Sequence, residues 1–455
     1  MHLSQTHWIH DALIYHIYPL GLCNAPKRND FSSAPSPRLD KIYEWIDHIV
    51  SLNMNTVYLG PLFESSAHGY DTADYFLVDR RLGDNQTLKN LIHTMKSKGL
   101  RVILDGVFNH VGRDFWAFRD VQMNGNQSAY TDWFHQLNFD QKSPYGDPFS
   151  YEGWDGHYDL VKLNLDNLSV RQHLFDAITM WVQEFDIDGL RLDAADVLHP
   201  NFMRELAHHT QQLKSDFWLM GEVVHGDYRQ WANQDMLHST TNYECYKGLY
   251  SSHVDKNYFE IAYSLNRQFG QDGIYKDLRL YSFVDNHDVN RIASQLTQIE
   301  HLYPAHILLF TMPGVPSIYY GSEWGIAGAR TPYHDHDLRP ALDLSIAHTL
   351  PHHNLEKIIS QLAYSRTQLQ ALQQGDYRQL HVNHEQFAFM RSTSEQCVIV
   401  AVNSASQHQT IHLTGIPHHT HWVDMLNQTE FVCQDGTLNI PLHPNWGAIL
   451  TLKQA

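Results

Sequence analysis

Several polar side chains of this sequence stand directly after short apolar segments. The segment YSFVDNHDVNR, residues 281–291, ends in Asp285, Asn286, His287, Asp288 and Arg291. Other apolar segments end in a similar way, in Asp105, Asn109 and His110, in Arg191 and Asp193, and in Glu222. Tyr70 and Asp71, in GYDTADY, follow the apolar segment TVYLGP. Carboxyl, imidazole and guanidinium groups that meet at one site can transfer protons, attack carbon and stabilise positive charge.

The environments of three carboxyl groups predict different protonation states. Arg191 and Asp193 are two residues apart, so on a strand they share a face, and the guanidinium would keep Asp193 ionised. Glu222 follows the apolar FWLM, and desolvation together with the charges of Asp193 and Asp288 would raise its pKa. An ionised and a protonated carboxyl group about 5–5.5 Å apart are what retaining glycoside hydrolysis requires. A third carboxylate would stabilise the oxocarbenium charge.

The segments that end in these residues are predicted to form parallel strands. They are nearly continuous apolar runs, which is typical of strands covered on both faces: IYHIYPL, TVYLGP, RVILDGV, GLRLDAA, FWLMGEVV, YSFVDNHD and PSIYYGSE. Amphipathic helices are expected between them, after Asp40, up to Gly99 and around residues 174–185. This alternation predicts an α/β fold, a (β/α)₈ TIM barrel, whose active site lies at the carboxyl ends of the strands.

The alternation of strands and helices is interrupted once and ends before the C-terminus. Residues 111–159 are rich in Asn, Gly, Asp and aromatics, which predicts an inserted subdomain after the third strand. The barrel would then comprise residues 1–110 and 160–375, with its sixth strand at residues 240–246 and a closing helix after about residue 350. Short strands beyond it predict a C-terminal antiparallel β-sandwich domain over residues 376–455.

Composition excludes several classes of function. The formal net charge of −18 argues against nucleic acid and against anionic membranes as partners, because both need a basic face. No secretion signal and no long apolar run are visible, so a cytoplasmic protein is expected. The four cysteines are far apart, and H-E-x-x-H is absent despite 33 histidines, so no metal site is predicted.

Taken in order, these motifs resemble the signature regions of the α-amylase superfamily of glycoside hydrolases. The matching stretches are DGVFNH, VKLN, GLRLDAADV, GEVV and FVDNHD. The resemblance implies that Asp193 is the nucleophile, Glu222 the general acid/base and Asp288 the carboxylate that grips the sugar. It also implies that the substrate is bound by Tyr70, His110, Arg191, His287, Asp335 and Arg339.

YEGWDGHYDLVKLN and GEVVHGDY are most similar to the cyclomaltodextrinase, neopullulanase and maltogenic amylase branch. The implied substrates are maltooligosaccharides or cyclodextrins, cleaved at α-1,4 bonds. Two departures are Val161, where that branch has proline, and the lack of room before LIYHIYPLG for its N-terminal β domain. No cofactor is required by the resemblance; a structural calcium ion beside Asn109 stays open, as does the oligomeric state.

Alternatives remain for the reaction and for single residues. A sugar could replace water as acceptor, as in an α-glucanotransferase or a glucoside isomerase such as trehalose synthase. A non-catalytic, amylase-like binding protein is a further alternative, although such proteins lose catalytic carboxylates. Asp105 is expected to be structural, Trp154 is the aromatic residue of the insertion best suited to stack on sugar, and Asp335 with Arg339 could instead form an ion pair in a solvated loop.

Overall fold

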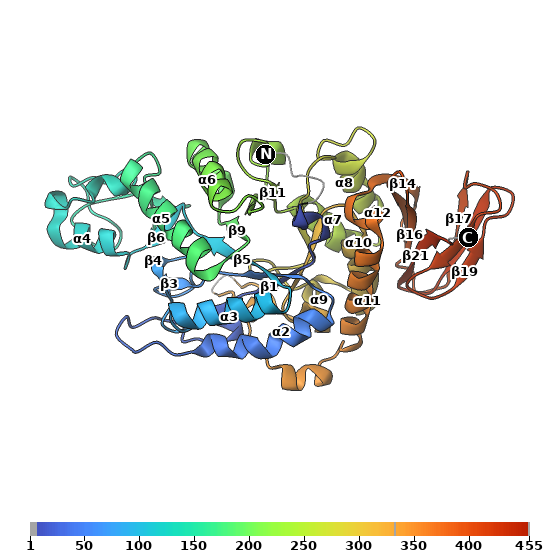
Figure 1. Cartoon of the computed structure of the whole chain (residues 1–455), viewed down its shortest axis with the longest axis horizontal. Helices are drawn as coiled ribbons and strands as arrows, with labels where there is room; N and C mark the ends of the chain where they lie inside the picture. Colours follow the sequence, from blue (N-terminus) through green and yellow to red (C-terminus); the bar gives the residue numbers. More distant parts are fainter. Residues whose placement is uncertain (1–6, 332–333, 454–455) are drawn as a thin grey trace.

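The computed structural model describes residues 7–331 and 334–453. A barrel occupies the centre of Figure 1, with the segment around α4 and β6 at one end and the sheet of β14, β16 and β21 at the other. Within the described residues no helix is long and apolar enough to cross a membrane.

The barrel is an eight-stranded parallel sheet in the order β11-β10-β9-β5-β2-β1-β13-β12. A parallel bridge between Thr241 and Tyr281 joins its two outer strands and closes the cylinder. The strands are β1 Ile14–Ile17, β2 Thr56–Leu59, β5 Arg101–Gly106, β9 Gly189–Leu192, β10 Trp218–Gly221, β11 Ser239–Thr240, β12 Tyr281–Phe283 and β13 Val315–Tyr319. The predicted fold class is thereby confirmed.

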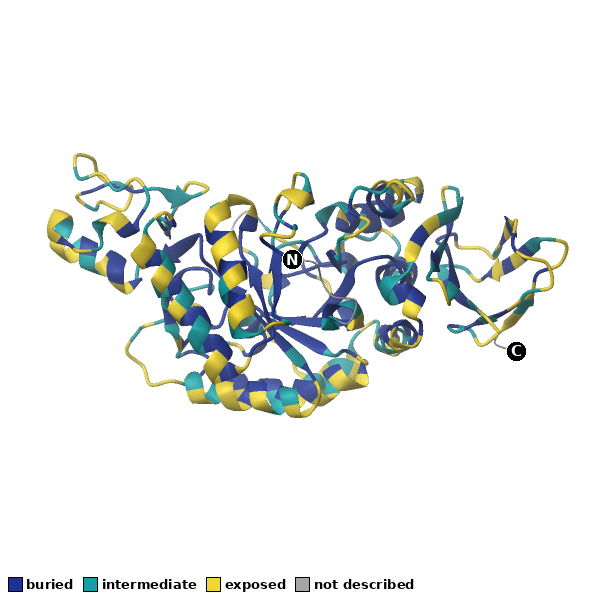
Figure 2. Cartoon of the chain, turned by 45° about the horizontal axis from the view of Figure 1, so that its top comes forward, coloured by how far each residue is buried: buried dark blue, intermediate teal, exposed yellow. Residues whose placement is uncertain are grey.

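Helices surround this cylinder, with their buried faces inward and their exposed faces outward (Figure 2). They are α2 Ile42–Ser51, α3 Asn85–Ser97, α5 Leu168–Phe185, α6 Pro200–Leu213, α7 Tyr243–Val254, α8 Phe259–Phe269, α10 Leu302–Thr311 and α11 Asn354–Gln368, with short helices at α1 Pro19–Leu22, α9 Ile292–Gln295 and α12 Gln370–Gln374. Because they cover the outside while side chains fill the inside, every residue of β1, β2, β9, β10 and β13 is buried.

Helix α5 shows how the sequence determines where a helix begins, which face is buried and where it ends. Its N-cap, Asn167, accepts hydrogen bonds from the backbone N–H groups of Ser169 and Val170, which satisfies donors that a helix start leaves free. Its buried side chains recur at helical spacing, and it ends at Asp186, which has a left-handed backbone with φ of 54°. The apolar periodicity therefore predicted α2, α3 and α5 correctly.

The predicted sixth strand is partly wrong. Residues 240–246 were expected to form it, but β11 ends at Thr240 and α7 begins at Tyr243. Asn242 is the reason, because its side chain accepts a hydrogen bond from the Cys245 backbone N–H and so caps the helix. The aromatic residues Tyr243 and Tyr246 therefore belong to a helix.

The segment after the third barrel strand folds beside the barrel mouth. It contains the helix α4 Trp116–Asn124 and a three-stranded antiparallel sheet of β6 His110–Gly112, β8 His157–Lys162 and β7 Gly153–Trp154. Phe118 packs against Phe134, Phe149 and Tyr151. A separate hairpin of β3 Phe63–Ser65 and β4 Thr72–Val78 carries the loop that contains Tyr70.

Two antiparallel sheets end the chain. The larger consists of β14 Asp376–Val382, β15 Gln386–Ser392, β16 Cys397–Asn403, β21 Trp446–Leu452, β18 His421–Asp424 and β19 Glu430–Val432, and the smaller of β17 Gln409–Thr414 and β20 Thr437–Leu442. One face of β16 packs towards the barrel, through Val398, Val400 and Val402. Its other face, with Ile399 and Ala401, packs against the smaller sheet. Burial on both faces explains the continuous apolar run of β16.

Candidate active site

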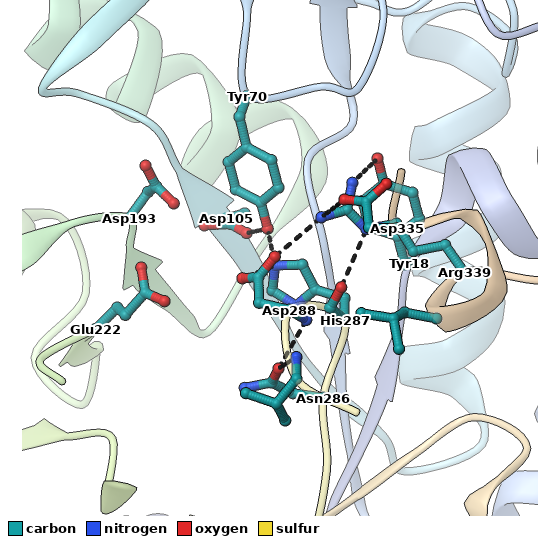
Figure 3. Close-up of polar contacts among 12 residues, drawn as sticks. Tyr18, Tyr70, Asp105, Asp193, Glu222, Asn286, His287, Asp288, Asp335 and Arg339 are labelled. Atoms are coloured by element: carbon teal, nitrogen blue, oxygen red, sulfur yellow. Dashed lines mark hydrogen bonds and ion pairs between the residues drawn. The ribbon is translucent and has the colours of Figure 1, made fainter. Parts of the chain in front are cut away.

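Arg191, on β9, lies at the centre of the polar residues that follow the strands. One terminal nitrogen, Nη1, lies 2.9 Å from Asp105 Oδ1 and 2.9 Å from Asp193 Oδ1. The other, Nη2, lies 2.7 Å from Glu222 Oε2. A single guanidinium thus joins the side chain of Asp105, on β5, to those of Asp193 and Glu222, which follow β9 and β10. Figure 3 shows the Asp193 and Glu222 carboxyl groups on the same side of Asp288.

The pKa of Asp193 is shifted in the direction opposite to the one expected from Arg191 alone. Burial raises the pKa of Asp193 well above its usual range, and Glu222, Asp105 and Asp288 raise it further, against the opposing charge of Arg191. The expected effect of Arg191 is present, but this cation is shared among several carboxyl groups. Asp193 and Glu222 thus contact the same cation, and the charge of Glu222 is among the causes that raise the pKa of Asp193.

Glu222 is held by the backbone as well as by Arg191. Its Oε2 accepts a hydrogen bond of 3.1 Å from the backbone N–H of Ala194. Its Oε1 lies 3.5 Å from the hydroxyl of Tyr243, which in turn accepts a hydrogen bond from the amide of Asn286. Tyr243 was missed in the sequence because residues 240–246 were assigned to a strand; its approach depends on the start of α7.

Asp288 is the third carboxylate, and it stands opposite this pair (Figure 3). Its Oδ2 lies 2.8 Å from His287 Nε2, and its Oδ1 lies 2.9 Å from Arg339 Nη2. Burial acts to raise the pKa of Asp288, but His287 and Arg339 outweigh it and hold that pKa well below its usual range. With 33% of its side chain exposed, Asp288 is an ionised carboxylate that a ligand can reach.

Tyr70 and His287 form one wall of the site. The rings are stacked with centroids 5.5 Å apart, and the Tyr70 hydroxyl contacts His287 Nε2. The same hydroxyl donates to Asp105 Oδ2 at 3.0 Å, and Tyr58 donates to that oxygen at 2.8 Å. Asp105 thus joins Arg191 to two tyrosines, which agrees with the structural role expected for it.

His110 presents a nitrogen to the site. The Asn109 amide donates to Nδ1 at 3.1 Å, which leaves the ring proton on Nε2. Nε2 lies 3.8 Å from Asp193 Oδ2, and no described residue hydrogen-bonds to it. Burial lowers the pKa of His110 to about 3, so the ring is neutral and Nε2–H is a free donor. The ring of Trp154 lies 5.5 Å from it.

Arg339 and Asp335 belong to the site rather than to a solvated loop. Their side chains are 2.8 Å apart, and Arg339 also donates to the backbone oxygen of His287 at 3.1 Å. The guanidinium lies over the ring of Tyr18, which was not predicted. Tyr18 follows β1 and is buried, and its position after the first apolar run was the available signal.

Every predicted site residue therefore joins one continuous set of contacts. Two members of the 281–291 segment lie outside it: Asp285 accepts from Ser322 and from the Ile292 backbone, and Arg291 donates to the backbone oxygens of Tyr320 and Leu338. They hold the loop after β12 in place. Across residues 7–331 and 334–453, no three His, Cys, Asp or Glu side chains are grouped to hold a metal ion.

Comparison with known proteins identifies the group to which this architecture belongs. Residues 36–366 match the family model of the α-amylase catalytic domain. This chain belongs to the α-amylase family. Residues 377–447 match the model of the maltogenic amylase C-terminal domain. The chain is therefore a glycoside hydrolase of the α-amylase family, and the predicted resemblance is confirmed.

Relatives of this α-amylase family member include a cyclomaltodextrinase from a Bacillus species, 30% identical over 427 residues that cover 89% of this chain and 74% of the relative. Neopullulanase 2 from Thermoactinomyces vulgaris is 30% identical in an alignment that covers 98% of this chain and 78% of that protein. A solved cyclomaltodextrinase structure has a TM-score of 0.87 at 26% identity and covers 99% of this chain and 79% of its own. Cyclic α-maltosyl-(1→6)-maltose hydrolase from Arthrobacter globiformis, ligand-free, has a TM-score of 0.83 at 26% identity, with 99% and 100% covered.

Proposed function

We propose that this hydrolase cleaves α-1,4 bonds of maltooligosaccharides or cyclodextrins by double displacement, with Asp193 as nucleophile and Glu222 as general acid/base. One observation supports this above all: Arg191 holds Asp193 and Glu222 on its two terminal nitrogens, while the ionised Asp288 stands opposite. Two adjacent carboxyl groups and a third anion are what attack, protonation and oxocarbenium stabilisation need.

In the first step the Asp193 carboxylate attacks the anomeric carbon while Glu222 protonates the glycosidic oxygen. The bond between the anomeric carbon and the glycosidic oxygen then breaks. In the second step the Glu222 carboxylate takes a proton from water, the water oxygen attacks the anomeric carbon, and Asp193 leaves as a carboxylate. The mechanism requires one proton on the pair, and that proton must be on Glu222 when the glycosidic bond breaks.

The other side chains of the site fit a sugar in this position. The free Nε2–H of His110 is a donor for a hydroxyl group beside Asp193. Asp288 can accept from hydroxyl groups and stabilise the positive charge that develops on the ring. Relatives named cyclomaltodextrinase, neopullulanase and maltogenic α-amylase support short or cyclic α-glucans as substrates.

The test is Glu222→Gln, which keeps the size of the side chain and removes its acid. We expect kcat on maltotriose and β-cyclodextrin to fall by about 10³-fold or more, because proton transfer and departure of the leaving group both depend on Glu222. The matched control is Glu184→Gln, an exposed residue of α5 that pairs with Lys89. Unchanged turnover in Glu222→Gln would refute the assignment.

The products of the wild-type protein test the rest of the proposal. Double displacement retains the anomeric configuration, so NMR should show the α-anomer of the new reducing end before mutarotation. The β-anomer as first product would contradict it. Longer oligosaccharides or trehalose among the first products from maltotriose would show that sugar replaces water as acceptor.

A further inference from the structure

A cavity of about 570 Å³ lies at the end of the barrel opposite the candidate active site. Four residues of its lining precede barrel strands: His10 precedes β1, His238 precedes β11, Arg279 precedes β12 and Pro313 precedes β13. Gly375, just before β14, adds a wall from the C-terminal sheets. The carboxyl groups of the active site follow the strands, so the length of the barrel separates them from this cavity.

Arg279 gives the cavity a cation that forms no ion pair with any described Asp or Glu. Its Nε donates to His10 Nδ1 at 3.3 Å, and neither terminal nitrogen bonds to a residue that the structure describes. Burial lowers the pKa of Arg279, and the charges of Asp277 and Asp376 oppose this shift without cancelling it. Both aspartates are exposed, so water and salt screen them. The terminal N–H donors of this guanidinium therefore remain for a ligand.

Two buried arginines behind the wall of the cavity add to this positive charge. Arg366 donates to the backbone oxygens on either side of Pro313, and Arg391 donates to the backbone oxygen of Gly375. Burial lowers the pKa of Arg366 to about 9 and that of Arg391 well below its usual range, and the charge of Arg279 lowers both further. Nearby aspartates oppose these shifts only in part. In a chain of net charge −18, this place has an excess of positive charge.

His238 and Lys276 supply further donors. The Nδ1 of His238 accepts from the Leu219 backbone N–H at 3.0 Å, so the ring proton is on Nε2, for which the structure describes no acceptor. Burial lowers the pKa of His238 to about 3, so its ring is a neutral donor. Lys276 is exposed and lies 3.7 Å from Asp376, which leaves its other N–H groups available. Cations and neutral donors are the groups that bind an oxyanion.

The rest of the lining suits an organic anion rather than a bare ion. Leu237, Phe269 and Leu278 give the cavity apolar surface. The volume lies within the range of about 300–1,000 Å³ that small-molecule sites occupy. A ligand that fills this space therefore has a carbon skeleton as well as a charged group.

We propose that this cavity binds a small organic anion, whose phosphate or carboxylate group pairs with Arg279 while its carbon skeleton lies against the apolar lining. Guanidinium groups bind both oxyanions through paired N–H···O bonds. The simpler alternative is that Arg279 only stabilises the barrel, as residues at this end commonly do. That role gives no reason for a cation that burial disfavours and that no ion pair compensates. The proposal is independent of the proposed function, because it uses no residue of the active site.

The experiment is calorimetry on the full chain carrying Glu222→Gln, with and without saturating maltotriose. The probes are glucose 6-phosphate and gluconate, and glucose is the uncharged comparison. We expect at least one anion to bind with a Kd of about 1 mM or lower, and its affinity to change less than about twofold when maltotriose is present. Glucose should not bind once maltotriose occupies the active site.

Arg279→Gln localises the site. It removes the charge and keeps a polar side chain, so we expect anion affinity to fall roughly 10- to 100-fold, as for lost hydrogen bonds to a charged group. Because burial disfavours the charge of Arg279, the fold should persist. Lys276→Gln, at an exposed position, should lower affinity about 2- to 5-fold. The matched control is Arg378→Gln, which removes the same charge from an exposed position of β14 outside the lining and should leave affinity unchanged.

The other results have definite meanings. Tighter binding of glucose 6-phosphate than of gluconate would assign a phosphate group to the ligand, and the reverse a carboxylate. Failure of both anions to bind at about 10 mM would overturn the proposal, as would full affinity in Arg279→Gln or displacement by maltotriose. If Arg279→Gln does not fold, full affinity in Lys276→Gln overturns it instead. Anion binding by a protein that turns over no glucan would refute only the proposed function.

Discussion

At the scale of single residues, one cation shared by three carboxyl groups decides the chemistry of the site. The sequence places Arg191 two residues before Asp193, and that neighbour alone predicts an ionised aspartate. The sequence does not show that Arg191 also lies 2.9 Å from Asp105 and 2.7 Å from Glu222, or that Asp193 is buried. These contacts come from separate strands, so the direction of the pKa shift could not be read from local spacing.

The raised pKa of Asp193 predicts a conflict between stability and activity. Because the folded protein binds this proton more tightly than the unfolded chain, the stabilising contribution is full below the ordinary Asp pKa of about 3.9 and is lost as pH rises through the folded-state pKa. Asp193→Asn cannot ionise, so at pH 8 it should abolish turnover and yet raise Tm by about 1–3 °C. Thermal unfolding at pH 8 and pH 4 checks this, since the gain should shrink at pH 4.

The control for this comparison is Asp272→Asn, at an exposed position, which should leave Tm unchanged at both pH values. A lower Tm for Asp193→Asn than for the wild-type protein at pH 8 would contradict the raised pKa, because it would mean that the ionised form stabilises the fold.

At the scale of elements, acidic residues at the two ends of a barrel strand have different roles. Asp193 follows β9, whereas Asp188 precedes it and is buried at the opposite end. Asp188 accepts from Lys96 and Lys214 at 2.8 Å and from the backbone N–H of Val102 at 2.9 Å. Its partners lie on α3, after α6 and on β5, so it ties together elements that are distant in sequence.

Asp188→Asn should therefore reduce stability without changing the site. We expect the free energy of unfolding to fall by about 2–4 kcal/mol, because two lysines lose a buried partner, with KM for maltotriose unchanged. Asp186→Asn is the matched control: it contacts the same lysines, but its side chain is 68% exposed, so a loss below about 1 kcal/mol is expected. Urea unfolding measures both; equal losses would contradict the role given to burial.

Much of the fold could be predicted from the sequence, because apolar runs and helical spacing are local. β9, β10 and β12 coincide with apolar runs, and α5 coincides with a segment whose apolar residues recur at helical spacing. The failure at β11 is local as well, since the capping of α7 by Asn242 outweighs the β propensity of the aromatic residues after it. The approach of Tyr18 to Arg339 and of Tyr243 to Glu222 depends on closure of the barrel, so no local pattern indicates it.

At the scale of the whole molecule, the C-terminal sheets are bound to the barrel by a shared core. Side chains of β15 and β16, such as Phe387, Phe389 and Val400, belong to the same hydrophobic cluster as the barrel helices. Tyr258 donates its backbone N–H to His384 at 2.9 Å across this contact. Because the two parts share buried apolar surface, we expect them to unfold together rather than as separate units.

Arg391 offers the test of this coupling. This buried residue of β15 donates to the Thr311 backbone oxygen at the end of α10 at 2.8 Å and to Gly375 at 2.9 Å. Arg391→Ala leaves these oxygens unpaired and opens a cavity, so we expect a loss of about 2–4 kcal/mol, whereas the exposed Arg378→Ala on the neighbouring strand should change stability by less than about 0.5 kcal/mol. Tryptophan fluorescence and residual activity should fall at the same urea concentration in the wild-type protein and in Arg391→Ala. Two separate transitions in the wild-type protein would show that the barrel and the sheets fold independently.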